Sequence, residues 1–490
     1  MRHARILVRT LFIFSFALMV SITVMAQQSA ERTASAVDEV FADVAAPGSP
    51  GCALAVARDG KLLYTKGYGT ANLEQNVPIT ADSVFDIGST SKQFSAASIL
   101  LLEKQGKLSV NDDVGKYIPE LPNYGTPITI LNLLNHTSGL RDYLALFDLS
   151  GVNVDSVTTD DEALALIVRQ KALDFKPGSE WLYSNSGFFL LSIIVKRVSG
   201  HSLREFAAES IFAPLGMSHT LYRDSHTLLI PNRALAYDPV EKSSRYTLDV
   251  SYFEQTGDGA VHTTVGDLLR WDENFYTAQI GGKAFLAELQ TPGTLSSGKT
   301  LTYAKGLFVA PYRGLPTVRH GGSWGGYRAE LLRFPEQHFS VVCLCNRSDS
   351  DPGGRAERVA DIYLAPLPKP KEKKVEDRHE VTRKPEISVP AESLGAMAGL
   401  YWSDELAVTY KLTVIDGKLA LAQILGLPNM PRSSELNGTI LIPVAKDEFD
   451  TTDAGMTFHF QRDSAGLLGS FTLDVGRSKG ISFKRISSNL

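Results

Sequence analysis

The apolar positions of this chain change their period from one region to the next. Residues 96–102 form a continuous apolar run and residues 188–198 form another, so both predict buried helices. Residues 52–58 and 61–67 instead predict two strands, because the Asp59-Gly60 pair between them is a strong signal for a short hairpin turn. The early part of the chain therefore combines a hairpin with buried helices.

Strand patterns return late in the chain. Residues 317–320, 327–334 and 339–345 predict three strands, and residues 355–364 predict a helix after them. Most of residues 107–300 favour helices joined by loops. We expect the early hairpin and the late strands to share one antiparallel sheet with helices on its faces. The predicted fold class is therefore α/β in its α+β form: an antiparallel sheet flanked by helices, plus a helical lobe.

The composition changes after residue 364. Residues 365–389 are rich in proline and in charges of both signs, which is typical of a solvated linker. In residues 390–490, short alternating segments follow one another at near-regular spacing, separated by turns such as Asp416-Gly417. This pattern predicts a small all-β domain, a barrel or a sandwich, and we favour the barrel. The domain contains no catalytic constellation.

The start of the chain resembles a secretory signal. Three arginines lie in the first nine residues, an apolar stretch covers residues 11–25, and Ala26 offers a small residue for cleavage. We expect residues 1–26 to be a signal peptide. The mature protein is then exported, to the periplasm or outside the cell, without a stable membrane anchor. The alternative is an uncleaved N-terminal anchor, for which the stretch is short.

Charge and cysteine content narrow the chemistry. The formal net charge is -5, which argues against a nucleic-acid partner. The three cysteines, Cys52, Cys343 and Cys345, are too few for a disulfide scaffold. Cys343 and Cys345 alternate in a predicted strand, and we interpret them as small buried apolar residues rather than metal ligands. The sequence carries no metallohydrolase motif, so neither a metal nor another cofactor is expected.

The first chemical motif is Ser89-Thr90-Ser91-Lys92, directly before the apolar run 96–102. Ser89 and Lys92 are three residues apart, so both side chains fall on one face of the first helical turn. A lysine can take the proton of a serine hydroxyl when burial or nearby positive charge lowers its pKa. The helix start also supplies unpaired N–H groups for an oxyanion. Alone, the motif favours the ordinary interpretation, a helix cap beside a solvated lysine.

Two further motifs follow in chain order. Tyr183-Ser184-Asn185 precedes a predicted helix and, alone, fits a core tyrosine followed by a turn residue. His320-Gly321-Gly322 opens a glycine-rich stretch that, alone, fits a tight turn. Taken together and in this order, the three motifs resemble those of the serine β-lactamase and penicillin-binding-protein superfamily.

The tyrosine of the second motif makes the chain similar to the class C β-lactamase branch, which includes DD-peptidases, D-aminopeptidases and esterases. The segments His136-Thr137-Ser138-Gly139-Leu140 and Pro214-Leu215-Gly216-Met217 resemble further landmarks of this family. The resemblance covers about residues 30–364, so we assign residues 27–364 to a hydrolase domain. Residues 390–490 resemble, more weakly, the lipocalin-like barrel appended to some members.

The resemblance implies a role for each motif residue. Ser89 is the nucleophile that forms an acyl-enzyme, and Lys92 helps to remove its proton. Tyr183 lies beside both; its phenol, with an ordinary pKa of about 10, needs a nearby cation to act as a base, and it can protonate the leaving group. Asn185 binds the substrate amide or holds Lys92. The backbone N–H groups of Ser89 and Ser323 form the oxyanion hole.

The third motif, expected on the edge strand beside the site, supplies the substrate-binding residues His320, Gly321 and Gly322. Here the chain departs from true β-lactamases, which usually carry a lysine that attracts the carboxylate of the antibiotic. Histidine is only partly charged at neutral pH. A histidine at this position of the third motif makes the chain similar to some DD-peptidases, D-aminopeptidases and esterases of the family.

The sequence therefore predicts an exported serine hydrolase that acts through an acyl-enzyme on small amides or esters, including D-amino-acid peptides. The alternatives are a β-lactamase and a non-catalytic penicillin-recognising module. The expected partner is a small-molecule or short-peptide substrate. The natural substrate, the role of the barrel, cleavage of the signal and assembly into a homo-oligomer stay open.

Overall fold

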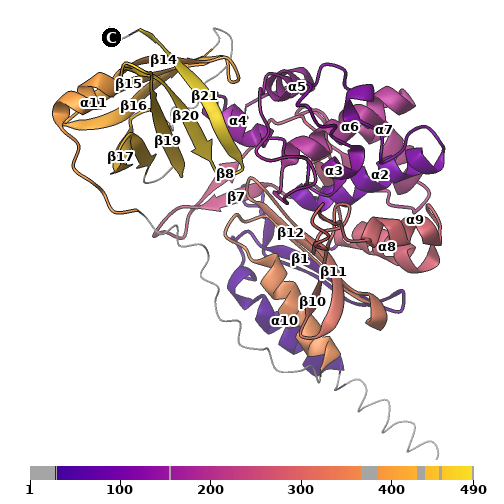
Figure 1. The fold of residues 1–490 in the computed structure, drawn as a ribbon. Coiled ribbons are helices and arrows are strands. Elements are labelled where there is room, and N and C mark those ends of the chain that lie inside the picture. Colours follow the sequence, from indigo (N-terminus) through magenta and orange to yellow (C-terminus); the bar gives the residue numbers. More distant parts are fainter. Residues whose placement is uncertain are drawn as a thin grey trace, which may run out of the picture.

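The computed structural model describes residue 28 and residues 30–153, 156–365, 384–426, 436–451 and 455–487. The predicted signal peptide, residues 1–26, and most of the predicted linker lie outside these residues. Figure 1 shows a mixed α/β part that carries most of the chain and a separate barrel near the C-terminus. The predicted fold class is confirmed.

One antiparallel sheet of six strands organises the larger part. Its strand order is β10-β11-β12-β13-β1-β2, so the early hairpin pairs with the late strands as predicted. The strands are β1 (Cys52–Arg58), β2 (Lys61–Tyr68), β10 (Phe308–Tyr312), β11 (Leu315–Trp324), β12 (Tyr327–Phe334) and β13 (Phe339–Cys345). Every residue of the central strand β13 is buried, because helices cover both faces of the sheet.

Alternate residues of the central strands enter two different cores. Val342 and Leu344 join the larger core, together with Trp271, whereas Val341 and Cys343 pack in a smaller core on the opposite face. This follows from the two-residue period of a strand. The smaller core is closed by α10 (Pro352–Leu364) and by the first helix of the chain, which covers residues 30–40 and is followed by η1 (Ala42–Val44).

The larger core contains the helical lobe (Figure 1). Its central helices are α2 and α6, which pack against each other. The predicted run 188–198 lies within α6. The helices of this part are α2 (Lys92–Lys104), α3 (Ile130–Leu134), α4 (Tyr143–Leu149), α5 (Asp160–Val168), α6 (Asn185–Ser199), α7 (Leu203–Ala207), α8 (Val265–Thr277) and α9 (Lys283–Gln290), with short turns η2 (Gly88–Ser91), η3 (Val114–Lys116), η4 (Ala208–Phe212) and η5 (Pro335–Gln337).

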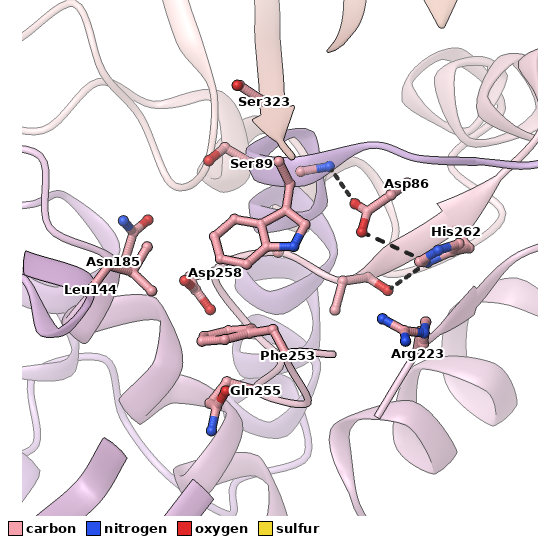
Figure 2. Close-up of a pocket in the computed structure, with 14 residues that line it drawn as sticks. Asp86, Ser89, Leu144, Asn185, Arg223, Phe253, Gln255, Asp258, His262 and Ser323 are labelled. Atoms are coloured by element: carbon pink, nitrogen blue, oxygen red, sulfur yellow. Dashed lines mark hydrogen bonds and ion pairs between the residues drawn. The ribbon is translucent and has the colours of Figure 1, made fainter. Parts of the chain in front are cut away.

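Three small sheets complete this part. The strands β5 (Phe85–Asp86), β9 (Val261–Thr263) and β6 (Leu221–Tyr222) form one of them. In the chain, β5 lies directly before the turn that carries Ser89. Figure 2 shows Asp86 and His262 of this sheet side by side. The distance from His262 Nδ1 to Asp86 Oδ2 is 4.0 Å. The other two pairs are β3 (Thr70–Asn72) with β4 (Val77–Pro78), and β7 (Ala236–Pro239) with β8 (Tyr246–Asp249).

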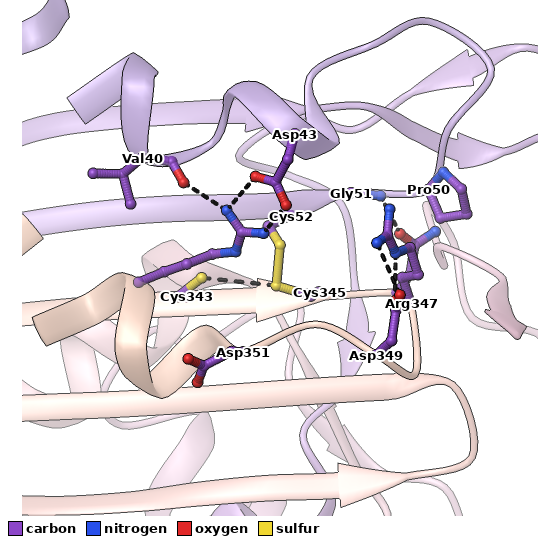
Figure 3. The surroundings of a disulfide bond; sticks show 12 residues. Val40, Asp43, Pro50, Gly51, Cys52, Cys343, Cys345, Arg347, Asp349 and Asp351 are labelled. Atoms are coloured by element: carbon purple, nitrogen blue, oxygen red, sulfur yellow. Dashed lines mark hydrogen bonds and ion pairs between the residues drawn. A yellow bond between two sulfur atoms is a disulfide. The ribbon is translucent and has the colours of Figure 1, made fainter. Parts of the chain in front are cut away.

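A disulfide joins Cys52 of β1 to Cys345 of β13, 293 residues apart in the sequence (Figure 3). Strand pairing places these two cysteines directly opposite each other, so the interpretation of Cys345 as a small buried apolar residue is wrong. Cys343 is a buried free thiol whose Sγ lies 3.8 Å from that of Cys345. Next to the disulfide, Arg355 of α10 binds the carbonyl of Val40 and the carboxylate of Asp43, which ties α10 to the first helix.

The C-terminal domain is a closed barrel of eight antiparallel strands (Figure 1). Pairing of the first strand with the last closes it, and aromatic side chains such as Tyr401, Phe458 and Phe471 fill its interior. The sequence missed two strands, β14 and β18. The domain begins with α11 (Ala391–Met397), and its strands are β14 (Gly399–Ser403), β15 (Val408–Ile415), β16 (Lys418–Leu425), β17 (Thr439–Ala445), β18 (Glu448–Thr451), β19 (Met456–Arg462), β20 (Leu468–Val475) and β21 (Ser478–Ser487).

Among the described residues, no helix combines the length and the apolar character that crossing a membrane requires.

The disulfide generates a stability prediction. Replacing Cys52 and Cys345 together by alanine removes a cross-link that closes a very long loop, and we expect the free energy of unfolding to fall by about 2–4 kcal/mol. Denaturant unfolding followed by fluorescence measures the change. A reducing agent should destabilise the wild type and leave the double variant unaffected; equal stability of the two proteins under oxidising conditions would contradict the prediction.

Candidate active site

Ser89 lies in the turn η2, immediately before α2, where the sequence predicted the first helical turn. The preceding Gly88 has φ +46°, and a side chain there would meet the backbone nitrogen of Ser323 at 2.7 Å. The N–H of Gly88 donates to the carboxylate of Asp86 at 2.8 Å. This hydrogen bond joins the turn η2 to the preceding strand β5. Glycine is therefore required at this position by both backbone conformation and space.

Lys92 is fully buried and its Nζ donates three hydrogen bonds. The acceptors are Ser89 Oγ at 3.0 Å, Asn185 Oδ1 at 2.9 Å and the backbone carbonyl of Asp258 at 2.5 Å. Burial lowers the pKa of Lys92 to about 7, while the nearby carboxylates of Asp258 and Asp142 oppose this shift. A large fraction of Lys92 is therefore neutral near pH 7 and able to accept the proton of Ser89.

Tyr183 lies just before α6, and the Nζ of Lys92 is 4.9 Å from the centre of its ring. Burial raises the pKa of Tyr183; the Ser89 hydroxyl and Arg477 act in the opposite direction. The phenol oxygen has no hydrogen-bond partner among the described residues, so its contact with Ser89 falls short of hydrogen-bond geometry. A raised pKa keeps the phenol protonated, which suits a proton donor better than a base.

His136, from the landmark segment 136–140, packs against the ring of Tyr183. The two rings lie 4.2 Å apart, and the Nδ1 of His136 accepts the backbone N–H of Ser184 at 3.2 Å. Its Nε2 faces the hydroxyl of Tyr303 at 3.1 Å. Burial first, and then the charge of Lys92, lower the pKa of His136 well below its usual value, so it is neutral here.

His320 does not present a charge to the site. Its side chain is buried, and its ring nitrogens face the carbonyl of Gly321 at 2.6 Å and the hydroxyl of Tyr303 at 3.3 Å. Burial, reinforced by Lys92, lowers its pKa to about 3. The third motif therefore carries no cation at neutral pH.

The glycines of the third motif let β11 approach the nucleophile turn. A side chain on Gly322 would meet the carbonyl oxygen of Ile87 at 1.8 Å, and the hydroxyl of Thr90 donates to the carbonyl of His320 at 3.1 Å. The expectation of an edge strand needs correction, because β10 lies outside β11. However, β10 pairs only with residues 315–319, so within the described part of the chain no strand pairs with His320 to Trp324 on that side.

Ser89 and Ser323 line one pocket, together with Asn185 and Asp258. Figure 2 shows the side chains of these residues around the cavity, with Phe253 on the opposite wall. Ser89 is only partly buried, so its hydroxyl is accessible from this pocket. The structure thus brings together Ser89, Lys92, Tyr183, Asn185 and Ser323, which come from three motifs far apart in the sequence.

The sequence missed two acidic residues at this site. Asp258 is nine-tenths buried, its backbone carbonyl accepts from Lys92, and its carboxylate accepts the hydroxyl of Tyr143 at 3.0 Å. Asp142 is fully buried and its Oδ2 accepts both the backbone N–H and the side-chain amide of Asn185, at 2.8 and 3.0 Å. Neither residue lies in one of the three motifs, so no local pattern pointed to them.

Residues 37–364 match the protein family described as Beta-lactamase. The chain belongs to this family. It is 32% identical over 309 residues to penicillin-binding protein 4* of Bacillus subtilis (strain 168), over 60% of this chain and 67% of that protein. It is 30% identical over 324 residues to a D-aminopeptidase of Gluconobacter oxydans (strain 621H), over 65% of this chain and 60% of the relative. The family predicted from the three motifs is confirmed.

Solved structures share the fold over different parts of the chain. The octameric penicillin-binding protein homologue from Pyrococcus abyssi is 24% identical, with a TM-score of 0.61, and the match covers 93% of this chain and 99% of that one. The D-amino acid amidase from Ochrobactrum anthropi SV3, solved with D-phenylalanine, is 21% identical with a TM-score of 0.58, over 68% of this chain and 99% of that one. The match to the Pyrococcus abyssi structure therefore includes the barrel as well as the hydrolase domain.

The close approach at Gly322 generates a prediction. In Gly322→Ala the new methyl group would overlap the carbonyl of Ile87, so β11 or η2 has to move. We expect a loss of stability of about 1–3 kcal/mol and slower acylation of Ser89, measured by unfolding and by reaction with a fluorophosphonate. Gly321→Ala is the matched control, because its methyl group would meet only the end of the Glu330 side chain, at 3.1 Å. An equal effect of the two variants would contradict this account.

Proposed function

We propose that this protein is an exported serine hydrolase that acts through an acyl-enzyme at Ser89. The observation that carries the proposal is the hydrogen bond from a buried lysine of lowered pKa to the serine hydroxyl. A solvated lysine would be charged at neutral pH and unable to accept a proton. Lys92 is instead desolvated, and burial of this kind is a common means of activating a nucleophile.

The geometry supports the following sequence of steps. Neutral Lys92 takes the proton of Ser89, whose Oγ attacks the carbonyl carbon of an amide or ester. The oxyanion accepts hydrogen bonds from the backbone N–H groups of Ser89 and Ser323, each worth roughly 3–4 kcal/mol in other serine enzymes. The C–N or C–O bond then breaks, and the leaving group takes a proton from Tyr183, which Lys92 reprotonates. Water next attacks the acyl ester and loses its proton to Lys92. The bond from the acyl carbon to Ser89 Oγ then breaks, the acid leaves, and Lys92 returns the proton to Oγ, which restores the free hydroxyl and the neutral amine.

We propose small amides and esters, including short D-amino-acid peptides, as substrates. The D-aminopeptidase relatives support this class. The neutral His320 supports it as well, because the site lacks the cation in the third motif with which β-lactamases attract the carboxylate of the antibiotic.

Because a structural neighbour is an octamer, light scattering of the purified protein should accompany the activity measurements to test for a homo-oligomer.

The decisive experiment is covalent labelling. Purified protein is incubated with a fluorophosphonate and, separately, with a penicillin, and the adducts are measured by intact-mass spectrometry and peptide mapping. We expect a fluorophosphonate adduct on Ser89 in the wild type and none in Ser89→Ala. A long-lived penicillin adduct supports a DD-peptidase-like site, and fluorophosphonate labelling alone supports an aminopeptidase, amidase or esterase. Rapid loss of the penicillin without an adduct supports a β-lactamase, and no adduct from either reagent overturns the proposal.

Lys92 sets the pH dependence. Since only the neutral amine can accept the proton of Ser89 and its pKa is about 7, the labelling rate should rise with pH through this value and level off above it. Stopped assays between about pH 5 and pH 9 measure the profile. A rate independent of pH over this range would rule out Lys92 as the base.

The role of Lys92 is also tested by substitution. We expect Lys92→Ala to slow labelling by roughly 10²–10⁴-fold, the usual contribution of a general base. Lys107→Ala, which removes an exposed lysine just beyond the end of the same helix, is the matched control and should label at the wild-type rate. Labelling of Lys92→Ala at a rate close to that of the control would contradict the mechanism.

A further inference from the structure

A turn of the barrel reaches the catalytic residues. Arg477 stands between β20 and β21, and its backbone carbonyl accepts the N–H of Asp142 at 3.3 Å. Its guanidinium lies over the ring of Tyr183, 5.4 Å from the ring centre, and donates to the carbonyl of Tyr183 at 3.4 Å. The same nitrogen, Nη1, is 3.4 Å from Asp142 Oδ2. One residue of the C-terminal domain thus contacts Tyr183, and also Asp142, which binds Asn185 of the site.

The contact with Asp142 leads directly to Ser89. Asp142 holds both the backbone N–H and the side-chain amide of Asn185. The other end of that amide, Oδ1, accepts from Lys92, which in turn donates to Ser89. An unbroken series of polar contacts therefore runs from the barrel to the serine hydroxyl, and the orientation of Asn185 depends on a carboxylate that Arg477 borders.

Contacts other than the side chain of Arg477 also hold the barrel against the hydrolase domain. Arg141 and Glu405 form an ion pair of 2.6 Å across the two domains, and both side chains are almost fully buried. Glu405 also accepts the backbone N–H groups of Lys171 and Ser482, and the hydroxyl of Tyr410 donates to the carbonyl of Leu149 at 2.8 Å. In Figure 1 the barrel lies beside α4 and α5, where these contacts are made.

Arg477 also places a positive charge where the proton transfer occurs. Lys92 is faced by the carboxylates of Asp258 and Asp142, and both raise its pKa, whereas Arg477 lowers it. Arg477 likewise opposes the raised pKa of Tyr183. The remaining titratable groups packed around Lys92 and Tyr183 are uncharged here: burial keeps His136 and His320 neutral and keeps the phenols of Tyr143 and Tyr303 protonated.

We propose that Arg477 of the barrel is a positioning residue of the active site, which orients Tyr183 directly and Asn185 through Asp142. The barrel then contributes a residue to the arrangement of the active site and is not only an appended module. The inference rests on the proposed function, because it requires that Ser89 is acylated with the help of Lys92. Arg477 is not among the residues that line the pocket of Ser89, and the inference assigns it an action through Tyr183 and Asp142.

The test uses the full chain and the fluorophosphonate, so it needs no knowledge of the natural substrate. Arg477→Gln removes the charge and keeps a polar side chain, and Arg477→Lys keeps the charge. Lys484→Gln, which removes an exposed cation from the neighbouring part of β21, is the matched control. The rate of labelling at Ser89 is measured from about pH 5 to pH 10 for each protein, after thermal unfolding has shown that it is folded.

We expect Arg477→Gln to label roughly 10–100-fold more slowly at neutral pH, with the midpoint of its pH profile moved upward, because Lys92 loses a charge that lowers its pKa. Arg477→Lys should restore the midpoint and part of the rate, and Lys484→Gln should behave as the wild type. If Arg477→Gln does not fold, Arg477→Met, which keeps most of the aliphatic length, replaces it.

Three results would overturn the inference while the proposed function stands. They are wild-type labelling by Arg477→Gln, a slower rate with an unchanged midpoint, and failure of Arg477→Lys to restore the midpoint. A wild-type protein that is not labelled at Ser89 at all would instead overturn the proposed function.

Discussion

The active site depends on the burial of one amino group. Lys92 loses its contact with water, and this loss destabilises its charged form more than the two neighbouring carboxylates stabilise it. An amine buried in this way must still satisfy its hydrogen bonds, and it does so with a hydroxyl, an amide oxygen and a backbone carbonyl. These three acceptors come from different elements, so the reactivity of Ser89 requires that the whole helical lobe is folded around Lys92.

The six-stranded sheet is the platform that makes this arrangement possible. Residues 320–324 of β11, which extend beyond the part paired with β10, lie against the turn that carries Ser89. The absence of a side chain at Gly322 permits this contact. The disulfide between β1 and β13 joins the early hairpin to the late strands in the middle of the sheet. Residues near the two ends of the hydrolase domain are thereby held in register, which keeps the third motif beside the first.

The neutral state of His320 distinguishes this site from one built to attract an anion through its third motif. Its ring is hydrogen-bonded to Tyr303 and to the neighbouring carbonyl, and burial disfavours its charged form. A guanidinium from the barrel, that of Arg477, lies over the ring of Tyr183 at 5.4 Å, slightly farther than the amino group of Lys92. The charge balance of the site therefore depends on contacts between the two domains, of which the buried pair of Arg141 and Glu405 is the anchor.

Much of the fold and the core of the site could be predicted from the sequence, because the signals are local. The Asp59-Gly60 turn, the apolar run after Lys92, and the three motifs each depend on residues within a few positions of one another. Strands β14 and β18 escaped prediction because they are only five and four residues long, although their burial alternates in the folded barrel. The disulfide, the neutral state of His320, and the roles of Asp142 and Arg477 could not be predicted in this way. Each is created by strand register, by burial or by contact between residues that are distant in the sequence, from 43 positions for Asp142 and Asn185 to 293 for the two disulfide cysteines, and these exist only once the chain is folded.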